Sequence, residues 1–127
     1  MSTALWQVAL KVEEDHGVPV DVVTVGDHPV GDDSRALIGA ASEAMVNAAK
    51  HSGAGRISLY FEATDGELSV YVTDQGRGFD PNSVADDRRG ISGSIRSRVE
   101  KAGGSVDISS EVGEGTEVIL KMAVETK

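Results

Sequence analysis

The stretch RISLYFEATDGELSVYVTDQGRGFDP, from Arg56 to Pro81, predicts the type of sheet and the point at which a glycine-containing loop begins. Apolar residues alternate with polar ones on either side of Asp65-Gly66, a dipeptide typical of tight turns, so we expect a β-hairpin. The second strand ends at Asp74 and runs directly into Gly76 and Gly78. Such glycines let the backbone turn sharply and approach a ligand closely, although a plain loop fits the same residues.

Helices and strands surround this hairpin in an order that predicts the fold class. Apolar spacing predicts helices at 4–14, 34–50 and 91–102, and strands at 18–25, 105–110 and 116–124. Hairpins dominate this order, which favours an α+β fold, an α/β sandwich, over a doubly wound parallel sheet. We therefore expect a mixed, mostly antiparallel sheet packed against helices.

The composition is ordinary for one soluble globular domain, and it excludes several kinds of protein. The chain has 127 residues, of which 39% are hydrophobic and 26% charged, so we expect 1–127 to form a single domain. Residues 1–16 are either a linker or an extra N-terminal helix. No apolar run approaches the roughly 20 residues that span a bilayer. The absence of cysteine excludes disulfides, and the net charge of −9 disfavours nucleic-acid binding.

The predicted helix at 34–50 carries polar residues on one face. Glu43, Asn47 and Lys50 are spaced i, i+4 and i+7, which places them within about 60° of arc, with His51 at the edge. Carboxylate and amide oxygens suit Mg²⁺, and an ammonium group suits a phosphate oxygen. The same spacing also fits an exposed helix face with ordinary charges, so spacing alone leaves both interpretations open.

Two further glycine-containing segments have ambiguous roles when taken singly. Gly90 and Gly93 stand at the start of the last predicted helix, directly after Arg88 and Arg89. A helix N-terminus with free amides and nearby guanidinium groups binds phosphate well, but a solvated helix start fits equally. The segment GEGT at 113–116 is, by itself, a flexible hairpin connection.

The order of four segments resembles a known family. EAMVNAAKH, DQGRGFD, RRGISGS and GEGT are similar, in this order, to the N box and the three glycine boxes of the Bergerat-type (GHKL) ATP-binding fold shared by gyrase, Hsp90, histidine kinases and MutL. The Asn-x-x-Lys-His form of the first box resembles sensor histidine kinases that pair with LuxR-type response regulators. GVPVDVVTVGD and RRGISGSIRSRVEKAGG resemble the actinobacterial branch whose members often carry a PspC domain. The resemblance covers about residues 17–124.

This resemblance implies ATP and Mg²⁺ as cofactors and assigns roles to the polar positions. Asn47 would coordinate Mg²⁺, and Glu43 beside it would act in catalysis as a water-mediated metal partner or polarising base. Lys50 and His51 would face the phosphates. Asp74 would accept a hydrogen bond from the adenine amino group.

The remaining ATP-binding positions are Thr116, which would support Asp74 through a shared water, and a set of small residues. These would open the ATP lid, close it over the phosphates, or leave room beside the base. In that order they are Gly76 and Gly78, then Gly90, Gly93 and Ser94, then Gly113 and Gly115. The second glycine box departs from the G-x-G or G-L-x-G-M form of relatives, and Arg77 has no implied role.

The resemblance also implies a function within a larger protein. The domain would bind Mg·ATP and donate the γ-phosphate to a histidine on a separate dimerisation domain of a two-component sensor kinase, a helix pair that we expect to lie outside this chain. A LuxR-type response regulator would be the second partner. We expect a cytoplasmic domain of a membrane-bound sensor, with no membrane contact of its own and no nucleic-acid partner. Two alternatives keep the fold: a stand-alone serine kinase of the anti-sigma-factor type, and a nucleotide-gated interaction module without transfer activity.

Overall fold

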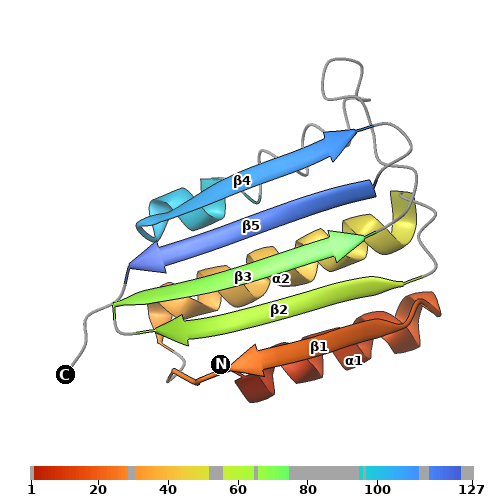
Figure 1. Cartoon of the computed structure of the whole chain (residues 1–127), viewed down its shortest axis with the longest axis horizontal. Helices are drawn as coiled ribbons and strands as arrows, with labels where there is room; N and C mark the ends of the chain where they lie inside the picture. The colour runs from red at the N-terminus through yellow and green to blue at the C-terminus, as the bar shows by residue number, and fades with distance from the viewer. Residues whose placement is uncertain are drawn as a thin grey trace.

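One mixed sheet forms the centre of the structure, a computed structural model that describes residues 2–28, 31–51, 56–64, 66–74, 95, 97–111 and 115–123. The strand order is β1-β2-β3-β5-β4, with β1 parallel to β2 and the other neighbours antiparallel (Figure 1). The strands are β1 (Val20–Val25), β2 (Ile57–Thr64), β3 (Glu67–Asp74), β4 (Gly104–Glu111) and β5 (Gly115–Ala123). The predicted mixed, mostly antiparallel sheet is thereby confirmed.

Helices cover one face of this sheet. α1 (Ser2–His16) and α2 (Asp32–His51) lie behind the strands in Figure 1, and residues 97–101 are helical as well. Each of these segments lies where the sequence predicts a helix, although α1 and α2 are longer than predicted. Within the described residues, no helix is both long and apolar enough to cross a membrane.

Local sequence signals explain how two of the strands begin or turn. Gly66 turns the β2–β3 hairpin with a φ of +93°, in the left-handed region that glycine adopts without strain. β1 begins at Val20 and not at the predicted Val18, because Pro19 has no N–H to donate to a sheet. The Val20 N–H donates to Glu13 Oε1 at 2.6 Å, which satisfies a donor on this edge strand.

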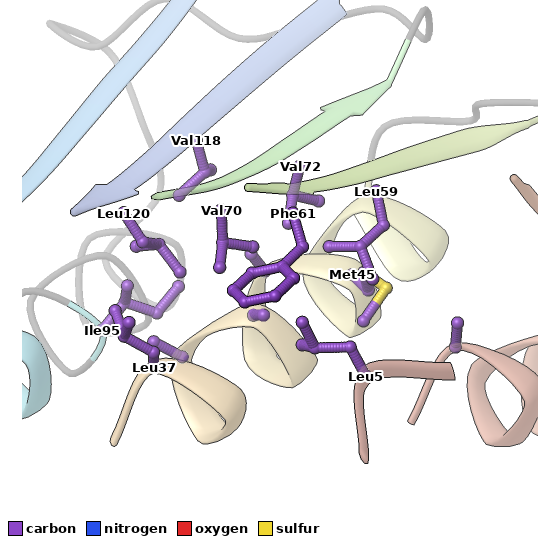
Figure 2. Packing of buried hydrophobic residues seen from close by; sticks show 14 of the residues in the cluster. Leu5, Leu37, Met45, Leu59, Phe61, Val70, Val72, Ile95, Val118 and Leu120 are labelled. Carbon is purple, nitrogen blue, oxygen red and sulfur yellow. The ribbon is translucent and has the colours of Figure 1, made fainter. Parts of the chain in front are cut away.

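The hydrophobic core lies between the sheet and the helices. Figure 2 shows Phe61 of β2 between the sheet and α2, near Leu37 and Met45, and all three side chains are fully buried. The alternation predicted for the hairpin is present, because every second residue of β3 from Leu68 to Asp74 is buried. α2 therefore packs against β3 and β5 with a fixed rotation about its axis, which positions the polar residues at its flank.

α1 packs against α2 and β1 through one apolar face. Leu5, Ala9 and Val12, spaced i, i+4 and i+7, are buried in the same core as the sheet residues. At the start of α1, the Ser2 N–H donates to Asp27 Oδ1 at 3.0 Å, and this bond holds the pKa of the Asp27 carboxyl well below its usual range. The first helix is therefore joined to the sheet at the end of β1.

Candidate functional site

Two residues of the polar face predicted on α2 are partly shielded from solvent. Glu43 and Asn47 lie one turn apart and are both half-buried, and their atoms Glu43 Oε2 and Asn47 Oδ1 are shielded from water. These two residues therefore do not belong to an ordinary exposed helix face. Lys50 and His51 are the last two residues of α2, and their side chains lie outside the described part of the structure.

Asp74 occupies a buried position at the end of β3. Asp74 is only 5% exposed, and such burial is unusual for a residue with a carboxylate side chain. In the sheet it pairs with Ile57 of β2 on one side and with Thr116 of β5 on the other. The register therefore places Asp74 directly opposite Thr116, the residue predicted to share a water with it, while Gly115 precedes Thr116 as the first residue of β5.

These two groups of residues lie at the same end of the molecule. Figure 1 shows that the C-terminal part of α2, the end of β3 and the beginning of β5 lie at the same end of the sheet. α2 also packs directly against both β3 and β5. The fold thus brings Asn47, Asp74 and Thr116 to neighbouring elements, although they are far apart in the sequence.

Several predicted site residues lie outside the described residues. They belong to the first two glycine boxes and to the connection between β4 and β5. They are Gly76, Gly78, Gly90, Gly93, Ser94 and Gly113. Their proposed contacts with a lid or a nucleotide stay predictions.

The sequence pattern does not single out a cation that the structure places beside Glu43. Arg98, in the helical residues 97–101, has its Nη1 atom 4.0 Å from Glu43 Oε2. Arg98 is followed by Val99, whose buried side chain sets the rotation of this helix. The apolar Val99 was the signal by which the sequence could have indicated Arg98. A buried residue at 99 places the neighbouring Arg98 at the flank of the helix and not in the core.

The donor set fits a hard metal ion held mainly through a substrate. Asn47 Oδ1 is a buried acceptor that receives no hydrogen bond from the part of the chain that the structure describes. Among the described residues, no three His, Cys, Asp or Glu side chains form a closed metal cage. Mg²⁺ is commonly bound by one or two protein oxygens together with substrate phosphates and water, so Asn47 with Glu43 nearby fits this mode.

Comparisons with known proteins agree with this geometry. Residues 32–126 match the family described as "Histidine kinase-, DNA gyrase B-, and HSP90-like ATPase". An "Uncharacterized sensor-like histidine kinase" of Chloroflexus aurantiacus is 32% identical over 115 residues, which cover 87% of this chain and 19% of that protein. The signal transduction histidine-protein kinase/phosphatase DegS of Bacillus subtilis is 32% identical over 90 residues, covering 68% of this chain and 23% of that protein. The chain spans about a fifth of the length of these relatives.

A solved structure supports the same assignment. Full-length ShkA in complex with AMPPNP has a TM-score of 0.76 to this chain at 26% identity, covering 98% of this chain and 30% of that one. This structural similarity covers almost the whole chain. It therefore extends to α1, which lies outside the residues 32–126 of the family match. The fold, the family match over most of the chain and the kinase relatives together lead to one conclusion: this chain belongs to the histidine kinase-, DNA gyrase B- and HSP90-like ATPases, as an ATP-binding domain of the sensor histidine kinase type.

Proposed function

We propose that this chain, as a single domain over residues 1–127, binds Mg·ATP and donates the γ-phosphate to a histidine on a separate dimerisation domain of a two-component sensor kinase. One observation carries the proposal: the buried Asp74 and the half-buried Asn47, whose Oδ1 atom is shielded from solvent, lie on packed elements at the same end of the molecule. A histidine acceptor is favoured over a serine acceptor because both relatives are named as histidine kinases.

Asp74 recognises the adenine base in this proposal. Its carboxylate accepts a hydrogen bond from the amino group of the base, and burial strengthens that bond because no water competes for the oxygen. Thr116, opposite Asp74 in the sheet, holds a water that both residues share. Gly113 and Gly115 leave room beside the base, since a side chain at either position would occupy that space.

The flank of α2 holds the metal ion and the phosphates. Asn47 would supply a neutral oxygen ligand for Mg²⁺, and Glu43, one turn before it, would act through a water or polarise the attacking group. When bound, Mg²⁺ neutralises charge on the phosphate oxygens. Lys50 and His51 face these oxygens from the last turn of α2. The lid residues of this proposal are Gly76 and Gly78 at its opening and Gly90, Gly93 and Ser94 at its closure.

Phosphoryl transfer needs positioning and charge neutralisation more than covalent chemistry by the protein. The chain's own residues therefore bind and orient ATP, while the imidazole nucleophile comes from the dimerisation domain. A LuxR-type response regulator then receives the phosphoryl group. In this arrangement the domain works on the cytoplasmic side of a membrane-bound sensor, where ATP is available.

Calorimetry on the 127-residue chain tests the nucleotide site. Asn47→Ala removes the proposed oxygen ligand, so the affinity for Mg·AMPPNP should fall at least about tenfold, as is typical when a metal site loses a group. Binding of AMPPNP in the presence of EDTA should change little. The matched control Gln7→Ala removes an exposed amide from α1 and should leave both affinities unchanged.

The proposal fails at the metal site if Asn47→Ala binds Mg·AMPPNP as tightly as the unaltered chain. The transfer step is tested separately in the full-length kinase that contains this domain. Incubation with labelled ATP should give acid-labile phosphate, as expected of phosphohistidine. Acid-stable phosphate would instead indicate a serine acceptor, and no phosphate would indicate a binding module.

A further inference from the structure

We propose that Arg98 is a positioning residue that orients the Glu43 carboxylate, an inference that rests on the proposed nucleotide site. Arg98 lies between the buried core and solvent, with 43% of its side chain exposed, and its Nη1 atom is 4.0 Å from Glu43 Oε2. Ile95 and Val99, three residues before and one residue after it, are almost fully buried. These two residues anchor the helix of Arg98 in the core. The backbone of Arg98 is therefore held in place relative to α2.

Gly39 provides the space that the Arg98 side chain occupies. A Cβ atom at Gly39 would lie 3.1 Å from Arg98 Nη1, 3.5 Å from its Cδ and 3.7 Å from its Cζ. The guanidinium therefore lies close over Gly39 of α2, and a Cβ atom there would require it to move by a few tenths of an ångström. Glycine destabilises a helix interior relative to alanine, so the contact with Arg98 gives this position a physical reason.

The same stripe of α2 leads from Arg98 to the proposed metal ligand. Gly39, Glu43 and Asn47 are spaced i, i+4 and i+8, which places all three within about 80° of the helix circumference. Arg98 lies at the N-terminal end of this stripe and Asn47 at its C-terminal end. A guanidinium at that end attracts the carboxylate of Glu43 and restricts the rotamers through which its oxygens reach toward Asn47.

A simple surface ion pair is the competing explanation, because a distance of 4.0 Å is long for a charged hydrogen bond. Two observations favour the positioning role. Glu43 Oε2 is shielded from solvent, whereas both partners of a surface pair stay hydrated. In addition, the Arg98 side chain packs closely against Gly39 of α2.

Titration of Mg²⁺ at saturating AMPPNP measures the effect. Arg98→Met keeps an unbranched stem over Gly39 but removes the charge, and it should weaken Mg²⁺ binding about two- to fivefold, the range expected for a partly exposed ion pair. Arg98→Lys restores the charge and should recover part of the affinity. Lys101→Met makes the same change at an exposed position of the same helix and should have no effect.

A double-mutant cycle distinguishes positioning of Glu43 from a general structural role. If Arg98 acts through Glu43, then Arg98→Met should have no further effect on Mg²⁺ affinity in a Glu43→Gln background. Gly39→Ala provides a second cycle. It should weaken Mg²⁺ binding when Arg98 is present, because the guanidinium is displaced, and should leave it unchanged beside Arg98→Met, where the guanidinium is gone.

Additive effects of Arg98→Met and Glu43→Gln would overturn the inference, and so would an unchanged Mg²⁺ affinity in Arg98→Met. A lowered Tm without a change in Mg²⁺ affinity would also overturn it, since it would indicate only a stabilising contact. Failure of the proposed function gives a different result. In that case the unaltered chain itself does not bind Mg·AMPPNP.

Discussion

Replacing Asp74 with asparagine tests whether this domain recognises adenine. A charged hydrogen bond contributes about 1.5–3 kcal/mol and a neutral one about 0.5–1.5 kcal/mol. Asp74 is only 5% exposed, so water does not substitute for the lost charge. The difference of about 1–1.5 kcal/mol predicts that Asp74→Asn weakens Mg·AMPPNP binding about five- to tenfold. The loss of affinity should be larger if the new asparagine turns its NH₂ group toward the base, because that group cannot accept a hydrogen bond from the adenine amino group.

The assay compares two nucleotides that differ at the proposed contact. Calorimetry is run with Mg·AMPPNP and with its inosine counterpart, in which a carbonyl replaces the 6-amino group. The unaltered chain should prefer the adenine nucleotide, because a carbonyl has no hydrogen to donate to a carboxylate. Asp74→Asn should lose most of this preference. Asp107→Asn, the same change at an exposed position of β4, serves as the matched control.

The affinities of Asp74→Asn for the two nucleotides show whether Asp74 contacts the adenine amino group. An equal loss of affinity for both would mean that Asp74 maintains the shape of the site and does not contact the amino group. An unaltered preference in Asp74→Asn would refute the reasoning directly. Circular dichroism of each variant without nucleotide shows whether the fold is retained before affinities are compared.

Two further predictions concern stability and titration. Gly17 and Gly26 both have positive φ, but a Cβ at Gly26 would lie 2.7 Å from Ala63 O, whereas no described atom lies within 4 Å of one at Gly17. Gly17→Ala should therefore cost about 1 kcal/mol and Gly26→Ala at least about 1 kcal/mol more in urea unfolding, and equal losses would contradict this. The hydrogen bond from Tyr60 to Glu62 raises the pKa of the phenol above 10.0, so this interaction stabilises the fold below about pH 10 and is lost as the pH rises through the folded pKa. Glu62→Gln should bring the phenolate absorbance titration back toward that of a free tyrosine, and an unchanged curve would rule out this cause.

The fold was predictable because strong local signals agree with the tertiary structure. The alternation in residues 57–74 and the turn at Gly66 predict the hairpin, and the apolar spacing of Leu37, Ala41 and Met45 predicts the buried face of α2. The ends of the elements were less predictable. The start of β1 depends on Pro19 and on a hydrogen bond from Val20 to a side chain of α1, which no local pattern contains.

The sequence suggests candidate site residues, but their contacts could not be predicted from it. Asp74 is a candidate in the sequence because it ends a predicted strand and is followed by Gly76 and Gly78. Its position opposite Thr116 depends on the pairing of β3 with β5, and sequence periodicity does not specify a register between strands so far apart in the chain. Arg98 and Gly39 escape prediction for the same reason, since their contact joins two helices through side chains alone.

Asp74 and Gly39 each break a local rule, and both border the candidate site. The alternation of β3 reserves position 74 for the core, yet the residue there is a carboxylate, whose burial costs free energy unless hydrogen bonds compensate for it. Gly39 lies inside α2, where alanine would be more stable by about 0.5–1 kcal/mol. Departures of this kind are expected at functional sites, and here one lies on α2 itself and the other at the end of β3, a strand that α2 packs against. A carboxylate in a core position of β3 and a glycine inside α2 are therefore consistent with the proposed nucleotide site between the end of β3 and the flank of α2.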